Sequence, residues 1–406
     1  MNAPETTRSA APTWDRDDPR YDRAAGAWVG AAAAACIVGA PPAMAEELAE
    51  PAGSDTAAAR LGRVLAAALR DLDGPRADGG TGHGHPTGAP GSGTSGASGN
   101  GATGRAWAAA LRRTVATGTV TAVDGAVPAE SPMGAAWRAV VSTPVPGLDP
   151  AGRVFPCSQL VEAVWNASAA GGDAAAMCAG ALAGARWGVS GVPLEAQRRL
   201  ADTVSPRALV TRGVVLARGS DPATWPEGEA YHTGASVYIR TDFHTPHPYD
   251  PGVVLGNLAH LRTGGDVDAV VSLNRISPTD APARIPARDR VEVWLHDREQ
   301  VNPNLHFVLD EAAGAVAALR AEGKRVLLHC AAGQSRTPAV AAHYAAQACG
   351  VPVVEALRRI VRAVGGHLKT PELAQATAAL NGVHLPDPLH DIFPEGPPPL
   401  RPLPPP

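Results

Sequence analysis

Cys330 and Arg336 enclose five residues, and this spacing of a nucleophile and a cation suits phosphate chemistry. An apolar, strand-like run precedes them at 325–328, and a helix-like run begins at Thr337. A cysteine in a loop between a strand and a helix faces backbone N–H groups and the positive end of the helix dipole. These groups stabilise a thiolate, and they also bind a phosphate. The loop is therefore predicted to hold a nucleophile together with the anion that it attacks.

Each position of this loop has an expected role. The backbone N–H groups would point inward at three phosphoryl oxygens, and Arg336 would close the ring with a planar, two-pronged donor. Gly333 permits a backbone bend that a side chain would hinder. His329 is expected behind the loop, hydrogen-bonded to backbone, and Thr337 is expected to donate its hydroxyl to the Cys330 sulfur, so that both stabilise the thiolate. The predicted phosphate-binding residues between nucleophile and cation are Ala331, Ala332, Gly333, Gln334 and Ser335.

A leaving oxygen needs a proton, and Asp297 is the predicted donor. It lies upstream of Cys330, just after the strand-like run Val291–Leu295. If Cys330 attacks a phosphate, the leaving oxygen departs and a phosphocysteine forms. An aspartic acid on such a loop can protonate that leaving oxygen and then act as a base on the water that hydrolyses the phosphocysteine. Asp289 and Glu299 are the nearest competitors for this role, and the alternative for Asp297 itself is a solvent-facing loop residue.

The composition excludes several classes of function. The chain of 406 residues has 35 Lys and Arg against 39 Asp and Glu, so its net charge of −4 indicates no attraction to nucleic acid or to a membrane surface. The five cysteines lack metal-ligand spacing and no signal peptide is recognised, so a cytoplasmic protein is expected. The Ala-rich stretch Ala24–Ala45 contains Pro41 and Pro42 and is predicted to be a buried small-residue helix rather than a membrane span.

The first half of the chain has helical periodicity interrupted by low-complexity sequence. Residues 1–20 are predicted to be disordered, and the Gly/Ser/Thr-rich tract at 74–104 is typical of a flexible linker within a helical unit at 21–218. A turn-rich boundary lies at 219–229, and the Pro-rich residues 394–406 are predicted to be a disordered tail. The predicted helices are contained in Tyr21–Leu72, Ala106–Val115, Gln159–Ala167, Ala174–Trp187 and Glu195–Thr203.

Residues 230–385 alternate strand-like and helix-like runs, which predicts an α/β domain with a mainly parallel central sheet. The predicted strands are Val237–Ile239, Val253–Leu255, Ala269–Leu273, Val291–Leu295 and Val326–Leu328. The predicted helices are Leu305–Glu322, Thr337–Ala348, Val353–Val364 and Pro371–Leu380.

A polar loop before Val253 gathers histidines and aspartates. Metal binding is one interpretation, but the prolines interspersed among these residues favour a rigid surface loop. The polar residues of this loop are His232, Asp242, His244, His247 and Asp250.

Residues 230–385 resemble the dual-specificity protein phosphatases of the cysteine-dependent superfamily. The resemblance rests on the run His329–Thr337, on Leu255-Gly256-Asn257 and on the loop that contains Asp297. It implies phosphate-monoester hydrolysis without a cofactor, acting on a phosphorylated protein or a small phosphomonoester. No phosphotyrosine-recognition segment is found, which indicates a shallow pocket that is also open to phosphoserine and phosphothreonine. Rhodanese-like enzymes share the strand–loop–helix plan, but their typical loop is shorter. The implied roles are nucleophile for Cys330, phosphate clamp for Arg336 and general acid for Asp297.

Residues 21–218 resemble the ADP-ribosylglycohydrolases, which are all-α hydrolases with a two-magnesium site. Residues 22–30 look like the first helix of that family, and residues 179–188 look like a later one. Gly53-Ser54-Asp55-Thr56 falls where the family has Thr-Asp-Asp-Thr, and Gly171-Gly172-Asp173-Ala174 falls where it has Asp-x-Asp-Thr.

The departures from that family's pattern matter more than the match. A two-magnesium site needs several hard oxygen ligands, and only Asp55 and Asp173 remain as weak metal candidates. We therefore expect a degenerate, shortened domain that scaffolds the protein or binds an ADP-ribosylated ligand. Two alternatives to a phosphatase stay open: magnesium-dependent removal of ADP-ribose, and a non-catalytic module that binds phosphate or ADP-ribose groups.

The fold class predicted for the whole chain is multidomain. An all-α domain is expected in the N-terminal half, followed by an α/β domain in the C-terminal half.

Overall fold

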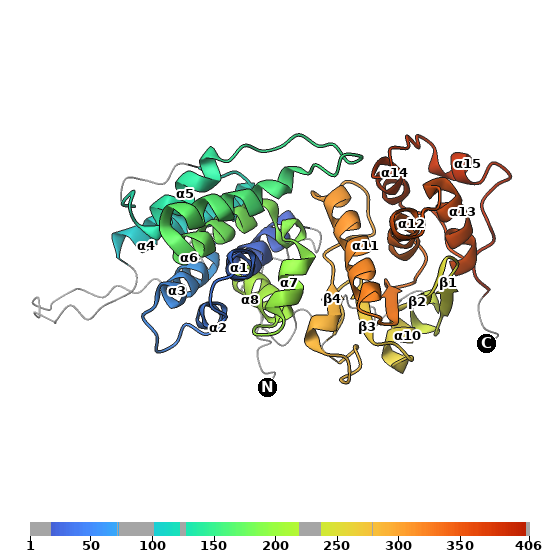
Figure 1. The fold of residues 1–406 in the computed structure, drawn as a ribbon, viewed down its shortest axis with the longest axis horizontal. Helices are drawn as coiled ribbons and strands as arrows, with labels where there is room; N and C mark the ends of the chain where they lie inside the picture. The colour runs from blue at the N-terminus through green and yellow to red at the C-terminus, as the bar shows by residue number, and fades with distance from the viewer. Residues whose placement is uncertain are drawn as a thin grey trace, which may run out of the picture.

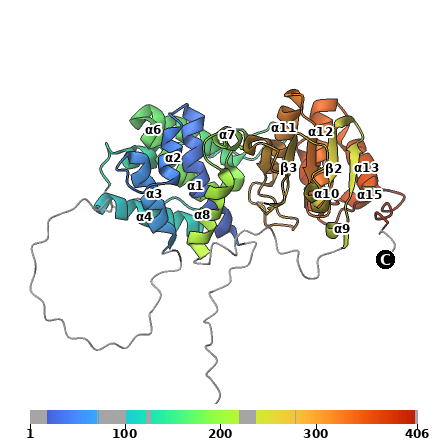
Figure 2. The ribbon, with the colours of Figure 1, turned by 90° about the horizontal axis from the view of Figure 1, so that it is seen from below.

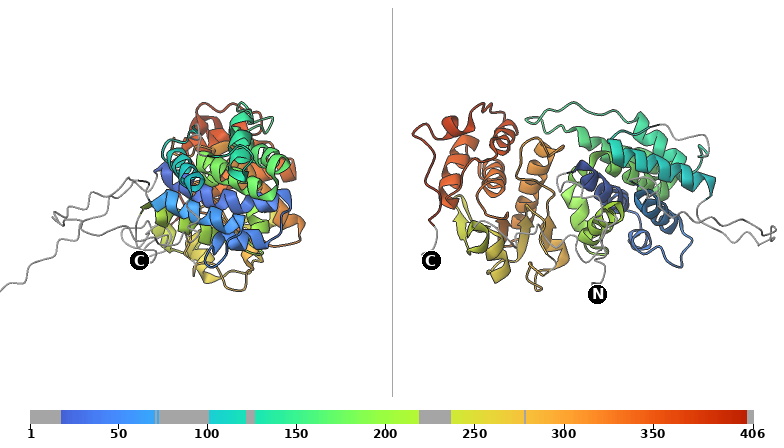
Figure 3. Two further views of the ribbon diagram at one scale, coloured as in Figure 1. Left: turned by 90° about the vertical axis from the view of Figure 1, so that its left-hand side faces the viewer. Right: turned by 180° about the vertical axis from the view of Figure 1, so that it is seen from behind.

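The chain forms a helical lobe from its N-terminal half and an α/β lobe from its C-terminal half, as a computed structural model shows (Figure 1). The lobes lie side by side in Figure 1 and in the right-hand view of Figure 3. The first 17 residues and residues 74–100 of the predicted linker lie outside the part of the chain that the structure describes. The disorder predicted up to residue 20 and the linker predicted up to residue 104 extend too far, because helices begin at Pro19 and at Ala102. The described residues are 18–70, 72, 101–121, 127–218, 237–277 and 279–402.

The helical lobe is built around the crossing of two long helices, α1 and α6. Its core is made mainly of alanine, leucine and valine side chains, so small residues allow the helices to pack closely. The helices are α1 (Pro19–Val38), α2 (Ala43–Ala49), α3 (Ala57–Arg70), α4 (Ala102–Thr117), α5 (Pro132–Ser142), α6 (Gln159–Trp187), α7 (Leu194–Leu200) and α8 (Pro206–Arg218).

Glycines set the distance between α1 and α6. A Cβ added to Gly26 would lie 2.3 Å from the carbonyl oxygen of Gly184, and one added to Gly30 would lie 2.4 Å from that of Gly180. The two backbones therefore touch, and a larger residue at either position would separate the helices. This contact buries the alanines of α1, as the sequence predicted. No helix among the described residues is long and apolar enough to cross a membrane.

A kink joins two predicted helices into α6. Gly171 and Gly172 have non-helical backbone angles, and Gly172 has a φ of +71°, which favours glycine. The two halves correspond to the predicted helices Gln159–Ala167 and Ala174–Trp187.

The α/β lobe contains a five-stranded sheet in the order β1-β2-β5-β3-β4. The pairing of β1 with β2 is antiparallel and the other three pairings are parallel, which confirms the mainly parallel sheet. The strands are β1 (His244–His247), β2 (Asp250–Gly256), β3 (Ala269–Ser272), β4 (Arg290–Glu292) and β5 (Val326–His329).

Helices cover both faces of this sheet. Val253 and Leu255 of β2 face the core shared with α11 to α14, whereas Val254 faces a smaller core shared with α10 (Figures 1 and 2). Because successive strand residues point to opposite faces, apolar runs without alternation indicate a sheet covered on both sides. The helices are α9 (Val237–Arg240), α10 (Leu258–Thr263), α11 (Leu305–Ala321), α12 (Arg336–Cys349), α13 (Val353–Val364), α14 (Pro371–Ala379) and α15 (Pro388–Ile392).

Two short segments differ from the sequence prediction. The run Val237–Ile239 was predicted to be a strand and instead lies in the single-turn helix α9, because three apolar residues carry too little periodicity to decide between the two. The edge strand β1 was not predicted, since it is polar and contains Pro246, at which its register shifts. Helices α5 and α8 were also missed.

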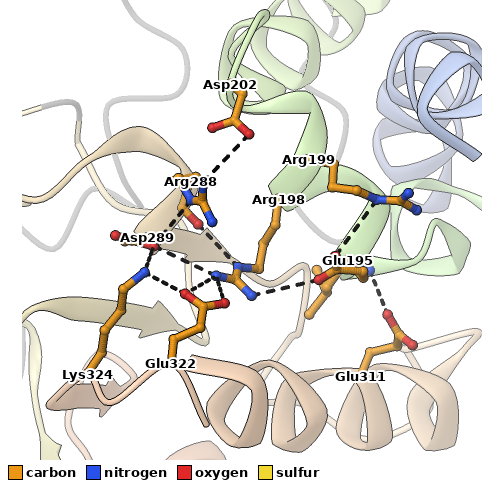
Figure 4. A network of polar contacts seen from close by, with 10 residues as sticks. Glu195, Arg198, Arg199, Asp202, Arg288, Asp289, Glu311, Glu322 and Lys324 are labelled. Atoms are coloured by element: carbon orange, nitrogen blue, oxygen red, sulfur yellow. Dashed lines mark hydrogen bonds and ion pairs between the residues drawn. The ribbon is translucent and has the colours of Figure 1, made fainter. Parts of the chain in front are cut away.

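Charged side chains join the two lobes. Arg198 of α7 donates to Glu322 at 2.9 Å and lies 3.7 Å from Asp289 in the α/β lobe, while Lys324 binds both of these acids (Figure 4). Nearby, the backbone N–H of Leu194 donates to the Glu311 carboxylate at 2.6 Å. Leu194 also packs within the core of the α/β lobe, so the helical half completes that core.

Candidate active site

Cys330 lies at the carboxyl end of β5, in the middle of the sheet. The parallel neighbours β2 and β3 end beside it, because Gly256 and Ser272 both pair with His329. The chain then turns through the loop 331–335 into α12, so the helix N-terminus lies next to the sulfur. Sγ accepts a hydrogen bond from the Gly333 N–H at 3.3 Å, and Cys330 is 1% exposed. A buried sulfur with an inward N–H donor matches a phosphate-binding loop.

Gly333 is required at its position for two reasons. Its φ of +75° is a conformation that residues with a side chain rarely adopt, and a Cβ there would lie 2.7 Å from the Gly256 carbonyl oxygen. The loop therefore rests directly on the end of β2. The backbone N–H of Leu258 also donates to the Ala331 carbonyl at 3.1 Å.

Arg336 is buried and anchored from one side. Its Nη1 donates to the carbonyl oxygens of Leu273 at 2.8 Å and Leu295 at 2.9 Å, which follow β3 and β4. Its Nε is buried and has no partner among the described residues. The guanidinium is thus held in place while a charged donor stays available for an anion.

Asp297 contacts the loop 331–335, called the phosphate loop below, from the segment after β4. Its Oδ1 accepts hydrogen bonds from the hydroxyls of Ser335 at 2.7 Å and Thr370 at 2.9 Å. Its two sequence competitors lie elsewhere: Asp289 binds Lys324 in the network between the lobes, and Glu299 is exposed. Of the three acids, Asp297 is the one that the structure brings to the loop.

His329 lies behind the loop. Its Nε2 lies 2.7 Å from the hydroxyl of Ser272, and its Nδ1 lies 3.3 Å from the carbonyl oxygen of Cys330. Burial lowers the pKa of His329 to about 4, so the ring is neutral at pH 7 and acts as a hydrogen-bonding support. Thr337 is fully buried, and its hydroxyl has no hydrogen-bond partner within the described part of the chain, the Cys330 sulfur included.

Arg401 is a residue of this site that the sequence analysis missed. It donates to the carbonyl oxygen of Ala332 at 3.0 Å, and its guanidinium stacks on Phe243 at 3.7 Å. The tail that was predicted to be disordered therefore contacts the loop 331–335 through Arg401, whereas most of residues 394–400 are exposed and residues 403–406 lie outside the described residues. The sequence gives little indication of this contact, because Arg401 is a single arginine in a Pro-rich segment.

The weak metal candidates of the helical lobe, Asp55 and Asp173, do not join a ligand cluster. Asp55 is exposed and pairs with Arg60 and Arg63, and Asp173 follows the kink in α6. Across the described ranges, the structure gathers one group of three potential metal ligands, and neither aspartate belongs to it.

Comparison with known proteins gives a match for the α/β lobe. Residues 261–369 match the family model "Dual specificity phosphatase, catalytic domain", whose members are cysteine-based hydrolases that need no cofactor. No curated protein and no solved structure matches the chain. The resemblance of residues 21–218 to ADP-ribosylglycohydrolases receives no support from these comparisons. The matched region contains Cys330, Arg336 and Asp297, and its similarity to that family supports a phosphatase of the dual-specificity type in this part of the chain.

Proposed function

We propose that the α/β lobe hydrolyses phosphate monoesters through a phosphocysteine intermediate on Cys330. The observation that carries this proposal is the meeting of three groups at one loop: the Cys330 sulfur, the Arg336 guanidinium, whose Nε has no partner within the described ranges, and the Asp297 carboxyl bound to Ser335. A nucleophile, an anion clamp and a proton donor are the parts that phosphoryl transfer to sulfur needs.

In the first step, the Cys330 thiolate forms a bond to phosphorus as the bond from phosphorus to the leaving oxygen breaks. Arg336 and the loop N–H groups bind the equatorial oxygens, where charge is spread in the transition state. Asp297 gives its proton to the leaving oxygen, so an alcohol or phenol departs rather than an alkoxide or phenoxide.

In the second step, water attacks the phosphocysteine. Asp297, now a carboxylate, takes one proton from the water, and the bond from phosphorus to sulfur breaks. Inorganic phosphate leaves, and the thiolate and the protonated acid are restored. The N–H of Gly333 stabilises the departing sulfur through the hydrogen bond seen in the structure.

The substrates that we infer are phosphotyrosine, phosphoserine and phosphothreonine residues in proteins or comparable small phosphomonoesters. The sequence carries no segment that would deepen the cleft to favour phosphotyrosine alone. A dephosphorylation assay on matched phosphopeptides would give comparable kcat/KM for the three classes. Activity confined to phosphotyrosine would refute this assignment.

An aryl-phosphate assay in the presence of EDTA tests the proposal. We expect wild-type turnover to persist in the chelator and the Cys330→Ser variant to lose it, because a serine hydroxyl at neutral pH is not an anionic nucleophile. Cys349→Ser is the matched control, since Cys349 is exposed at the end of α12, and it should retain activity. Full activity of Cys330→Ser, or phosphate binding without turnover in wild type, would contradict the proposal.

A further inference from the structure

Two histidines and an aspartate converge beside the start of β1. The Nδ1 atom of His260 lies 2.9 Å from Oδ1 of Asp242, and the Nδ1 atom of His244 lies 3.7 Å from the same oxygen. The two imidazole rings are stacked, with centroids 4.0 Å apart. The three potential ligand atoms all lie within 4.8 Å of one another.

These separations suit one small transition-metal ion. Two ligand atoms that bind zinc at about 2.0–2.1 Å in a tetrahedron lie roughly 3.3 Å apart. The measured 2.9 Å and 3.7 Å fall on either side of that value, and turning one imidazole out of the stack would direct both ring nitrogens at the same ion. Imidazole and carboxylate are ligands that zinc accepts, whereas magnesium and calcium prefer oxygen alone.

A buried amide holds the three ligands in place. The Oδ1 atom of Asn257 accepts hydrogen bonds from the N–H groups of Phe243 at 3.2 Å and His260 at 3.0 Å. Its Nδ2 donates to the carbonyl oxygens of Tyr238 and Thr241. Asn257 therefore fixes the segment that carries Asp242 and His244 against the helix that carries His260, which lowers the ordering cost of binding an ion.

The site is open to solvent on one side. The side chains of Asp242 and His244 are 45% and 55% exposed, whereas that of His260 is 8% exposed. An ion can enter from water and keep a water molecule as a fourth ligand. His247, which the sequence grouped with His244, turns away and lies close to the Ala341 carbonyl.

We propose that Asp242, His244 and His260 bind one zinc-class divalent ion through three protein ligands and water. The proposal does not depend on the phosphatase reaction. Its expected effect is structural, because the ion would tie the segment before β1 to α10. The N–H of Leu258, in the first turn of that helix, bonds the phosphate loop at Ala331. The ion would therefore stiffen one wall of that loop.

Metal titration of the full chain tests this site. The background is Cys330→Ser, since a thiolate also binds zinc and would add a second signal. Titration with Zn²⁺ by calorimetry, and with Co²⁺ by visible absorption, should show one equivalent bound, and Mg²⁺ should not compete. In this background, His244→Ala and Asp242→Asn should each weaken binding by at least the ~10–100-fold that loss of a supporting partner costs.

The variants should fold normally because both side chains are exposed, and circular dichroism would verify this. His384→Ala, an exposed histidine outside the cluster, is the matched control and should leave the affinity unchanged. The proposal would be overturned if no single equivalent of Zn²⁺ bound. It would also be overturned if His244→Ala and Asp242→Asn bound Zn²⁺ as tightly as the Cys330→Ser background does. Either result would mean that the cluster is a hydrogen-bonded group without an ion.

Discussion

The three candidate catalytic side chains are positioned by different kinds of hydrogen bond. Arg336 is fixed by two backbone carbonyls and leaves Nε for an anion, while the sulfur of Cys330 is fixed by one backbone N–H. Asp297 is instead held by two hydroxyls, those of Ser335 and Thr370. These two hydrogen bonds hold the carboxyl against the loop, within reach of a leaving group bound there.

Replacing Asp297 with Asn should lower turnover in a manner that depends on the leaving group. With phenyl phosphate, whose leaving group is poor, kcat/KM should fall by about 10²–10⁴-fold, the range typical of a lost general acid. With an aryl phosphate whose leaving group is stable as an anion, kcat/KM should change little, because it reports only the steps up to formation of the intermediate. The measurement is kcat/KM across a series of aryl phosphates, with Glu299→Gln as the exposed acidic control. An equal loss for all leaving groups would show that Asp297 has no role as an acid.

At this scale the sequence predicted the three residues that the structure gathers, because Cys-x5-Arg is a local motif fixed by one loop. Asp297 was harder to predict, since its contact with the loop depends on the fold of the whole lobe. Arg401 was missed for the same reason: nothing in a Pro-rich segment indicates that it returns to Ala332.

The segment that carries Asp297 is held at both ends. At its start the carbonyl oxygen of Leu295 accepts from Arg336, and at its end Asn304 donates to Trp187 and Ser190 of the helical lobe. The hydroxyl of Ser190 in turn donates to buried Asp22 at 2.5 Å. The position of the acid segment therefore depends on both lobes.

Replacing Ser190 with Ala should loosen this segment without touching the phosphate loop. We expect kcat/KM for phenyl phosphate to fall by up to about 100-fold, the cost of misplacing a catalytic group by about 1 Å. The kcat/KM of substrates with good leaving groups should remain near wild type, because formation of the intermediate from them does not need the acid. Arg199→Ala, which removes an exposed ion pair on α7, is the control. A loss that is the same for all substrates would argue against a selective effect on the acid.

The elements of the α/β lobe were predicted well where apolar runs were long. Helix α13 has the predicted bounds, β2 and β5 contain the predicted runs, and β3 ends one residue before the predicted run does. The prediction was wrong for short or polar elements such as α9 and β1, because tertiary contacts decide their conformation.

On the scale of the whole molecule, the two lobes share one interface and part of one core. The α/β core includes Phe155 and Leu194 from the helical half, and Phe155 packs edge-on against Phe307 at 5.5 Å. The interface also buries two carboxyls, Asp22 and Glu311. The sequence did not predict this docking, since no local pattern records which charged side chains meet across a boundary. The helical half is thus structurally tied to the α/β lobe.

The buried carboxyls predict how stability depends on pH. Burial raises the pKa of Asp22 to about 6 and that of Glu311 to about 7. The folded state therefore holds these protons at pH values where the unfolded chain has released them. Their stabilising contribution is full below about pH 4 and is lost as the pH rises to about 7. For Asp22 the shift of roughly two pKa units corresponds to about 3 kcal/mol.

Urea unfolding from pH 4 to 8 would check this. The difference in free energy of unfolding between Asp22→Asn and wild type should grow in favour of the variant as the pH rises from about 4 to 6, and then level off. Asp55→Asn is the exposed control, and its difference from wild type should not follow this course. A difference for Asp22→Asn that is constant with pH would show that Asp22 titrates normally.

The central claim, a phosphocysteine at Cys330, is tested most directly by trapping the intermediate. The Asp297→Asn variant with a good leaving group should form the intermediate quickly but hydrolyse it slowly, because only the second step still needs the base. Acid quenching during turnover, followed by digestion and mass spectrometry, should find one phosphoryl group on the peptide that contains Cys330. Turnover without that adduct, or an adduct that persists in the Asp297→Asn/Cys330→Ser double variant, would contradict the mechanism.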